Sequence, residues 1–262
     1  MPLDIDRFAH LQSPIQRWDP RFKIAALGLL AFGIALLKTL PVSVVAVVIA
    51  AALLTTSALP LQFVSHGLAF VSIFLVPFFL IMPFTYPGTA AFHVLGLPFA
   101  WEGLRLATLI FIKAIAIVMT TFAIFATARF DVSMVALQHL RVPRIIVQML
   151  LFTYRYTFVF LEEMRRMQTS MRARGFVPKT NMYTMTTMGN FVGTLLVRSF
   201  ERTERVYKAM LSKGYQGEFH TLVKFDSGGG DMAKALLAVV ILAGLLAADF
   251  SGMYNIAVKG WY

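Results

Sequence analysis

The sequence predicts an all-α polytopic membrane protein with about five transmembrane helices and two long amphipathic cytoplasmic helices. Hydrophobic residues make up 58% of the 262-residue chain and charged residues 14%, against roughly 25% charged residues in a typical soluble domain. Several apolar stretches approach or reach the roughly 17–25 residues that cross a bilayer. Residues 129–224 hold fifteen Lys and Arg against six Asp and Glu, which is +9 of the net +11. This imbalance marks the cytoplasmic side under the positive-inside rule.

Five apolar stretches are the predicted spans. They are Phe22–Leu37, Val42–Leu59, Leu68–Tyr86, Leu104–Ala128 and Ala233–Ala248. We expect Lys23 and Lys38, at the ends of the short first stretch, to reach the membrane interfaces. Pro77 and Pro83 predict a kink or close packing in the third stretch. We interpret Lys113 in the fourth as snorkelling or donating a local hydrogen bond within the bundle, in preference to a transport role.

The loops predict the orientation. Residues 87–101 contain no Lys or Arg and are therefore expected outside the cell. With four spans before residue 129, an N-terminus inside the cell returns the chain to the inside where the basic region begins, and the fifth span then places Val258–Tyr262 outside. Residues 1–21 are polar, so we expect no cleavable signal peptide there. The predicted organisation is a membrane region (1–128), a cytoplasmic helical region (129–224), and a hinge with a final span (225–262).

The cytoplasmic region is predicted to hold a short helix and two long ones. Asp131 is an expected N-cap of the short helix, which ends near Arg141, and Pro143 can open the next. The long helices are predicted over Ile145–Arg172 and Met182–Lys213, followed by a flexible hinge over Asp226–Asp231. Ion pairs at i,i+4 spacing are expected along the long helices. They are Glu162–Arg166, Glu201–Arg205 and Glu204–Lys208.

Both long helices end in nearly the same six residues. The first segment is Met171-Arg172-Ala173-Arg174-Gly175-Phe176, and the second is Met210-Leu211-Ser212-Lys213-Gly214-Tyr215. A glycine after the last turn and a cation beside it are expected of a helix C-cap. Because we expect ordinary capping to require neither the Met nor the aromatic residue, we interpret the repeat as a docking device. The cation would pair with a carboxylate in a partner's groove while the Met and the aromatic residue fill apolar hollows.

At these segments the sequence resembles the transmembrane T component of energy-coupling factor (ECF) transporters, most closely the CbiQ-type proteins of cobalt uptake. Ala173-Arg174-Gly175 matches the family's helix-end motif, whereas Ser212-Lys213-Gly214 keeps only the charge and the glycine. Lysine is a point charge without the planar fork of arginine. Further similar segments are residues 18–23 (Trp-Asp-Pro-Arg-Phe-Lys), 152–156, 162–166, 189–190 and 196–202. The opening residues 5–9 with Ser13-Pro14 resemble the metal-uptake branch.

The resemblance implies a non-catalytic subunit in the cytoplasmic membrane of a bacterium or archaeon. The implied partners are two ATP-binding-cassette ATPase subunits that bind ATP and Mg, a substrate-binding membrane subunit similar to CbiM, and a small accessory subunit similar to CbiN. The docking residues would be Arg172, Ala173, Arg174, Gly175, Ser212, Lys213 and Gly214, supported by Met171, Phe176, Met210 and Tyr215. The transported ion would be cobalt, with nickel as the alternative.

The residues themselves argue against chemistry within this chain. Glycines 228–230 lack the Lys-Ser/Thr of a P-loop, and cysteine is absent. The histidines are dispersed, with no pair at ligand spacing. They are His10, His66, His93, His139 and His220. We therefore expect no cofactor or metal on this chain, and the 14 methionines are expected to fill the core.

Three other function classes fit the sequence less well. An intramembrane prenyl or lipid transferase usually needs Asp-rich clusters to hold magnesium, and Glu162-Glu163 is the only adjacent acidic pair. A stand-alone carrier is expected to show inverted repeats and broken helices, which are not evident. Nucleic-acid binding would suit the positive charge, but no recognisable nucleic-acid module is present.

Overall fold

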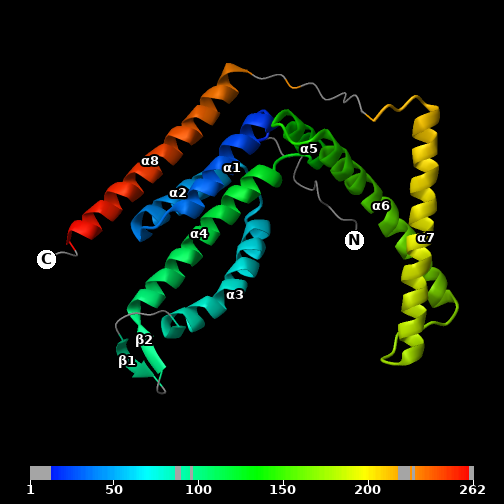
Figure 1. The fold of residues 1–262 in the computed structure, drawn as a ribbon, viewed down its shortest axis with the longest axis horizontal. Coiled ribbons are helices and arrows are strands. Elements are labelled where there is room, and N and C mark those ends of the chain that lie inside the picture. Colours follow the sequence, from blue (N-terminus) through cyan, green and yellow to red (C-terminus); the bar gives the residue numbers. More distant parts are fainter. Residues whose placement is uncertain (1–12, 86–89, 95–96, 218–224, 226–227, 260–262) are drawn as a thin grey trace. The chain divides into compact units, whose positions relative to one another are not determined.

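The computed structural model describes residues 13–85, 90–94, 97–217, 225 and 228–259. These residues form eight helices and one two-stranded hairpin (Figure 1). The helices are α1 (Pro20–Leu36), α2 (Leu40–Thr56), α3 (Leu61–Thr85), α4 (Trp101–Phe125), α5 (Phe130–His139), α6 (Arg144–Ala173), α7 (Met182–Ser212) and α8 (Gly229–Lys259). The described residues fall into two compact units: 141–217, and 13–140 together with 225–259.

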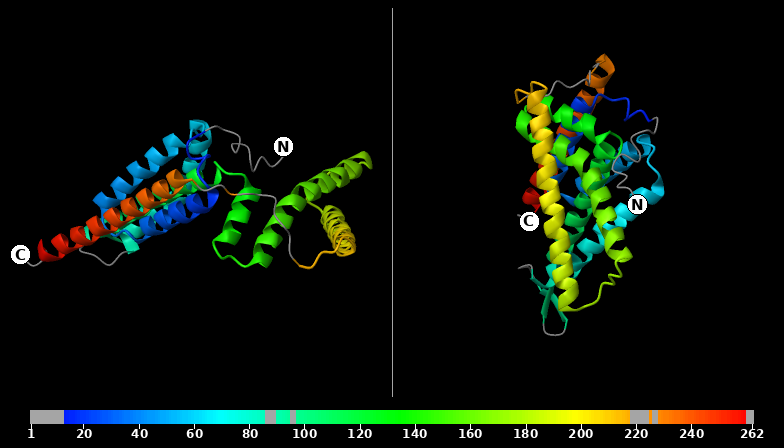
Figure 2. Two further views of the ribbon diagram at one scale, coloured as in Figure 1. Left: turned by 90° about the horizontal axis from the view of Figure 1, so that it is seen from above. Right: turned by 90° about the vertical axis from the view of Figure 1, so that its right-hand side faces the viewer.

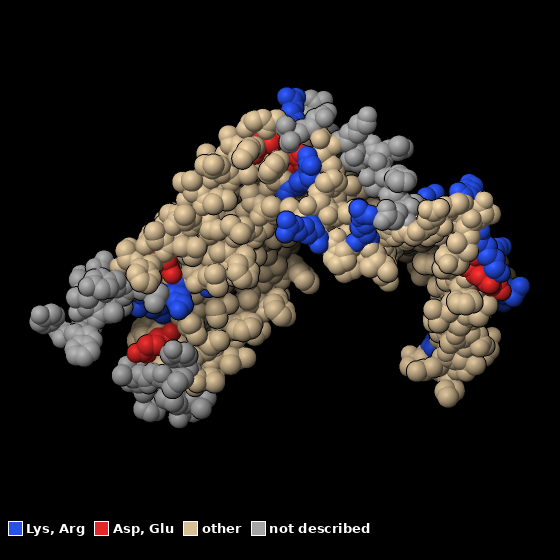
Figure 3. Space-filling view, turned by 45° about the horizontal axis from the view of Figure 1, so that its top comes forward, with Lys and Arg blue, Asp and Glu red and all other residues tan. Residues whose placement is uncertain are grey.

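The larger unit is a bundle of apolar helices (Figure 1). Helix α4 packs against α1, α2 and α3, and α8 packs mainly against α1. The core combines large aliphatic side chains with alanines, which let the helix backbones approach closely. Its buried residues include Leu27, Leu30, Ile34, Ala46, Ala50, Ala116, Ala123, Leu242 and Leu245. Figure 3 shows Lys and Arg gathered on α6 and α7 and sparse over much of the visible bundle surface.

The chain is an all-α polytopic membrane protein. Three expected spans, α3, α4 and α8, are long and apolar enough to cross a membrane. Helices α1 and α2 have 17 residues each, which is about 25 Å of rise, less than the roughly 30 Å of the hydrocarbon core. Helix α6 was expected to be amphipathic, yet by length and composition it also qualifies as a span.

Several helix boundaries differ from the prediction. Helix α3 starts at Leu61, before the expected Leu68, and α2 ends at Thr56. The predicted hinge is wrong at Gly229–Asp231, because these residues form the first turn of α8. The Trp18 indole Nε1 donates to the Asp231 carbonyl at 3.1 Å, which anchors that turn. Residues 226–227 of the predicted hinge lie outside the described residues.

A β-hairpin replaces the plain loop expected between α3 and α4. Strand β1 (Ala90–Val94) pairs antiparallel with β2 (Leu97–Ala100), with Phe92 opposite Phe99 and Val94 opposite Leu97. Figure 1 shows the hairpin at the ends of these two helices. It is a local addition that leaves the fold class unchanged.

Helix α3 continues through both of its internal prolines, Pro77 and Pro83, and it bends along its length (Figure 1). Its last turns lie close to the start of α4. A Cβ atom built on Gly103 of α4 would come within 2.4 Å of the Met82 carbonyl oxygen. The absence of a side chain at Gly103 therefore permits this close packing, as expected for a proline-kinked helix.

The smaller unit contains the two long amphipathic helices. Pro143 is the N-cap residue of α6, and the Asn181 side chain caps α7 by accepting from the Thr184 amide at 2.8 Å. In the larger unit, the expected N-cap of α5 is wrong, since α5 begins after Arg129 and Asp131 lies in its first turn. There the Asp131 carboxylate accepts a hydrogen bond from the Arg129 guanidinium. Its negative charge also interacts favourably with the positive end of the helix dipole.

Two of the three predicted ion pairs are confirmed. Glu162 pairs with Arg166 at 2.5 Å, and Glu204 pairs with Lys208 at 2.8 Å. Glu201 and Arg205 form no pair within the described chain. Instead, Glu163 of α6 pairs with Arg198 of α7 and links the two helices. In the left view of Figure 2, α7 is foreshortened beside α6, so the helix axes cross.

Candidate functional site

The end of α6 is closed by a Schellman motif. Gly175 has φ +76°, a left-handed conformation that glycine adopts without the steric cost of a Cβ atom. The Gly175 amide donates to the Arg172 carbonyl at 3.0 Å, and the Phe176 amide donates to the Met171 carbonyl at 3.1 Å. These two bonds define the motif. Arg174 is therefore the C-cap residue of α6.

Helix α7 ends in the same way. Gly214 has φ +81°, and its amide donates to the Leu211 carbonyl at 3.0 Å. The Tyr215 amide donates to the Met210 carbonyl at 3.1 Å, which places Lys213 at the C-cap. The predicted role of both glycines as helix terminators is confirmed.

The shared closure explains more of the repeat than expected. A Schellman motif is frequently accompanied by hydrophobic contact between the third-last helical residue and the residue after the glycine. In the first segment Met171 and Phe176 occupy those positions, and in the second Met210 and Tyr215 do. All four are half-buried. Capping does not require such a pair, but these positions give the Met and the aromatic residue a structural reason to recur that is independent of docking.

The cations at the two ends are not explained by capping alone. Arg174 and Lys213 are exposed, as are their neighbours Arg172, Ala173, Gly175, Ser212 and Gly214. Neither Arg174 nor Lys213 pairs with a carboxylate among the residues that the structure describes. Each lies next to the last carbonyls of its helix, which favour a positive charge. Both cations are therefore held on a rigid helix end and remain accessible.

The two ends lie far apart. The Tyr215 hydroxyl donates to the Gln148 side-chain oxygen at 3.2 Å, and the Gln148 amide donates to the Gly217 carbonyl at 3.2 Å. The second end is thereby tied to the start of α6, whereas Arg174 follows its last turn. The distance along α6 from Gln148 to Arg174 is about 39 Å at about 1.5 Å per residue. The smaller unit therefore presents two separate cationic tips.

The Asp-Pro-Arg segment at the start of α1 has a structural role. The Asp19 carboxylate caps α1 by accepting from the Arg21 amide at 2.9 Å and also pairs with the Arg21 guanidinium at 2.8 Å. Burial opposes ionisation of Asp19, but the hydrogen bonds from Arg21 outweigh it and hold the pKa of this carboxyl below its usual range. The Arg21 guanidinium lies 4.7 Å from the centre of the Phe225 ring.

The expected snorkelling of Lys23 is wrong. This side chain is 1% exposed, and its Nζ donates to the Thr127 hydroxyl at 3.0 Å. The hydroxyl of Thr127 in turn donates to the Ala123 carbonyl at 2.7 Å. The ammonium group is thus held inside the bundle, just beyond the end of α4, by a hydrogen bond that periodicity alone does not reveal.

A second polar cluster surrounds the turn between α1 and α2. Lys113 donates to the Leu37 carbonyl at 2.7 Å, which confirms the expected local hydrogen bond. The Asp249 carboxylate of α8 accepts from the amides of Lys38 and Thr39 and from the Thr39 hydroxyl. This cluster ties α4 and α8 to the turn.

The part played by Asp249 was missed at the level of sequence, because the predicted last span stopped one residue before it. A detectable signal was present: an acid inside a long apolar helix usually has a specific partner. The partners here are backbone amides of a distant turn, and sequence spacing does not identify them.

The histidines form no metal site in the part of the chain that the structure describes, where no three His, Cys, Asp or Glu side chains come together. The ring nitrogens of His66 and His139 each lie near a carbonyl of their own helix. His10 and His220 lie outside the described residues, and the side chain of His93 is not described.

Comparison with known families decides the assignment. A family model described as CbiQ, cobalt transport protein, matches residues 12–222. The chain belongs to the CbiQ family. The match includes both closed helix ends and the Asp-Pro-Arg segment, while residues 5–9, which suggested the metal-uptake branch, lie outside the match and the described residues.

Three relatives of this CbiQ-family chain are named as transporter components. It is 26% identical to the energy-coupling factor transporter transmembrane protein EcfT of Bacillus selenitireducens, over 95% of this chain and 97% of the relative. EcfT of Heliobacterium modesticaldum is 24% identical over 82% of this chain and 85% of the relative. The cobalt transport protein CbiQ of Rhodobacter capsulatus is 27% identical over 42% of this chain and 46% of the relative. These similarities identify a transmembrane component of an energy-coupling transporter.

Proposed function

We propose that this protein is the coupling subunit of a cobalt-uptake transporter, in which its two cationic tips dock into two ATP-binding-cassette ATPase subunits. The observation that carries this proposal is the pair of identical helix closures, each of which holds an exposed cation on a rigid end. A rigid helix transmits a displacement of its tip along its length. The α6–α7 pair would thereby convert ATPase closure into movement of a substrate-binding membrane subunit.

The two tips are not chemically equal in this proposal. Arg174 offers a planar fork that can bind a carboxylate with two parallel hydrogen bonds, whereas Lys213 offers a compact point charge. Ala173 and Ser212 are small and leave room for close approach. Arg172 adds a second cation at the first tip. We therefore assign the stronger docking contact to Arg174.

The remaining parts of the complex follow from this assignment. ATP and Mg would be bound by the ATPase subunits, and cobalt by a substrate-binding subunit similar to CbiM, with a small accessory subunit similar to CbiN. The N-terminus and residues 129–224 would face the cytoplasm between a membrane region (1–128) and a final hinge and span (225–262). The excess of +9 over residues 129–224 supports this orientation.

Uptake of radioactive cobalt by cells that express this chain with the neighbouring transporter subunits tests the proposal. The Arg174→Glu variant places a negative charge where a carboxylate is expected to dock, and repulsion replaces attraction. We expect uptake to fall to background while the amount of protein in the membrane stays unchanged.

Lys179→Glu is the matched control, because Lys179 is also an exposed cation in the connection after α6 but lies outside the closed helix end. It should retain most of the uptake. Normal cobalt uptake by well-expressed Arg174→Glu would contradict the docking role. Uptake of nickel in place of cobalt would leave the docking role intact and correct the substrate.

A further inference from the structure

A charged pocket lies between α6 and α7, away from both tips. Its volume is about 260 Å³, and it is lined by Phe160 and Glu163 of α6 and by Ser199 and a cluster of charged residues of α7. Those charged residues are Arg198, Glu201, Arg202 and Arg205. Arg198, Arg202 and Arg205 are spaced so that they share one face of the helix.

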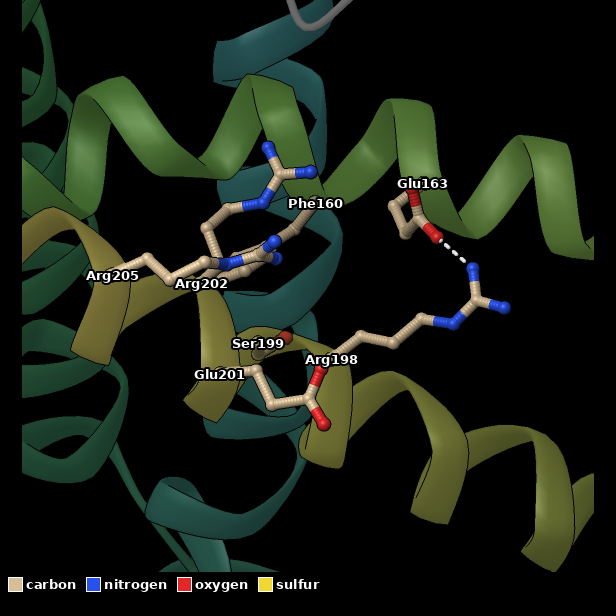
Figure 4. Close-up of a pocket in the computed structure, with 7 residues that line it drawn as sticks. All are labelled: Phe160, Glu163, Arg198, Ser199, Glu201, Arg202 and Arg205. Carbon is tan, nitrogen blue, oxygen red and sulfur yellow. Dashed lines mark hydrogen bonds and ion pairs between the residues drawn. The ribbon is translucent and has the colours of Figure 1, made fainter.

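The charges in this pocket are unequally compensated. Glu163 already forms an ion pair with Arg198. Figure 4 shows that Arg202 and Arg205 extend toward α6 beside Phe160, whereas Glu201 points away from them. Within the described residues, neither Arg202 nor Arg205 forms an ion pair. Two guanidinium groups thus share one small pocket without a carboxylate partner.

From this arrangement we propose that the pocket binds a phosphate group. Guanidinium groups match the oxygen geometry of phosphate and bind it with paired, charge-assisted hydrogen bonds. With a volume of about 260 Å³, the pocket has room for a phosphate group. Phe160 provides an apolar wall beside the two guanidinium groups. This site goes beyond the proposed docking function, since it includes none of the tip residues.

The phosphate can come from two sources with the same chemistry. One is the headgroup of an anionic phospholipid, since the helices belong to a membrane protein and anionic lipids attract basic segments at the membrane surface. The other is free inorganic phosphate in the cytoplasm. Either would bridge Arg202 and Arg205 and reduce the repulsion between them.

The test uses the full-length chain in lipid nanodiscs. In one arm, nanodiscs contain phosphatidylcholine with a minor fraction of phosphatidylglycerol, and native mass spectrometry measures which lipid stays bound. In the other arm, nanodiscs of phosphatidylcholine alone are titrated with inorganic phosphate in a calorimeter. Arg202→Gln/Arg205→Gln is compared with Lys179→Gln/Lys208→Gln, which removes the same charge from the same unit outside the pocket. Arg202→Lys/Arg205→Lys keeps both positive charges but removes the planar guanidinium groups.

We expect the wild type and the Lys179/Lys208 control to bind either phosphatidylglycerol or inorganic phosphate, with the same affinity as each other. The double Gln variant should bind at least about tenfold more weakly, and the double Lys variant should fall between them. Selective retention of phosphatidylglycerol identifies a lipid headgroup, and a heat of phosphate binding identifies free phosphate. No binding in either arm, or an equal loss in the control, overturns the proposal. It is also overturned if the double Gln variant binds the lipid or phosphate as tightly as the wild type does.

Discussion

At the scale of single residues, the buried ammonium of Lys23 depends on one hydroxyl group. Its only hydrogen-bond partner among the described residues is Thr127, and Lys23 is 1% exposed. Leaving a buried polar group without a partner costs more than the hydrogen bond contributes, because the desolvation is no longer compensated. The stability of the bundle should therefore be more sensitive to Thr127 than the size of this side chain suggests.

Thr127→Val tests this dependence. The substitution preserves shape but removes the acceptor of Lys23, and we expect it to destabilise the bundle by about 1–3 kcal/mol. Lys23→Met removes the charge together with its need for a partner, so this variant should lose less stability than Thr127→Val does. The double variant should be about as stable as Lys23→Met. Thermal unfolding in detergent, followed by tryptophan fluorescence, ranks the stabilities of the three variants. Equal destabilisation by the two single variants would show that Thr127 does not hold Lys23.

At the scale of single elements, the closure of α6 rests on the left-handed conformation of Gly175. A Cβ atom at this position would meet nothing within 4 Å, so the cost of a larger residue comes from the backbone alone. For an L-residue this cost is about 1–2 kcal/mol. The position of the Arg174 tip relative to α6 should depend on this left-handed conformation of Gly175.

Gly175→Ala and Gly189→Ala form a matched pair. Gly189 lies inside α7, also with nothing within 4 Å of an added Cβ atom, and alanine there should stabilise the helix by about 0.5–1 kcal/mol. We expect Gly175→Ala to lower the thermal midpoint and weaken ATPase binding, and Gly189→Ala to raise the midpoint. Unchanged ATPase binding by Gly175→Ala would show that the closure does not position the tip.

The ends of α6 and α7 could be predicted to within a residue or so because a helix end is specified locally. Gly175, Gly214 and Asn181 act on backbone groups only a few residues away. The start of α8 could not be predicted in this way, since it is anchored by Trp18, more than two hundred residues earlier. For the same reason the sequence did not reveal the partner of Lys23 or that of Asp249. The hairpin was missed because pairing of its strands is not a property of either strand alone.

At the scale of the whole molecule, the helical bundle and the α6–α7 unit differ in composition. The bundle is rich in apolar residues, and the charged groups of Lys23, Lys113 and Asp249 within it form hydrogen bonds. The α6–α7 unit carries most of the net positive charge and both closed helix ends. The fold class and the cationic tips could therefore be predicted from composition and from the repeat. The uncompensated arginines of the pocket could not, because i,i+4 spacing predicted a Glu201–Arg205 pair that does not form.

If each tip binds one ATPase subunit, native mass spectrometry of the purified complex will count the subunits that each variant retains. The wild-type chain should carry two ATPase subunits, Arg174→Glu and Lys213→Glu one each, and the double variant none. Because arginine can bind a carboxylate with two hydrogen bonds, Arg174→Glu should also cause the larger loss at low ATPase concentration. Two ATPase subunits bound to the double variant would show that the tips are not the docking sites.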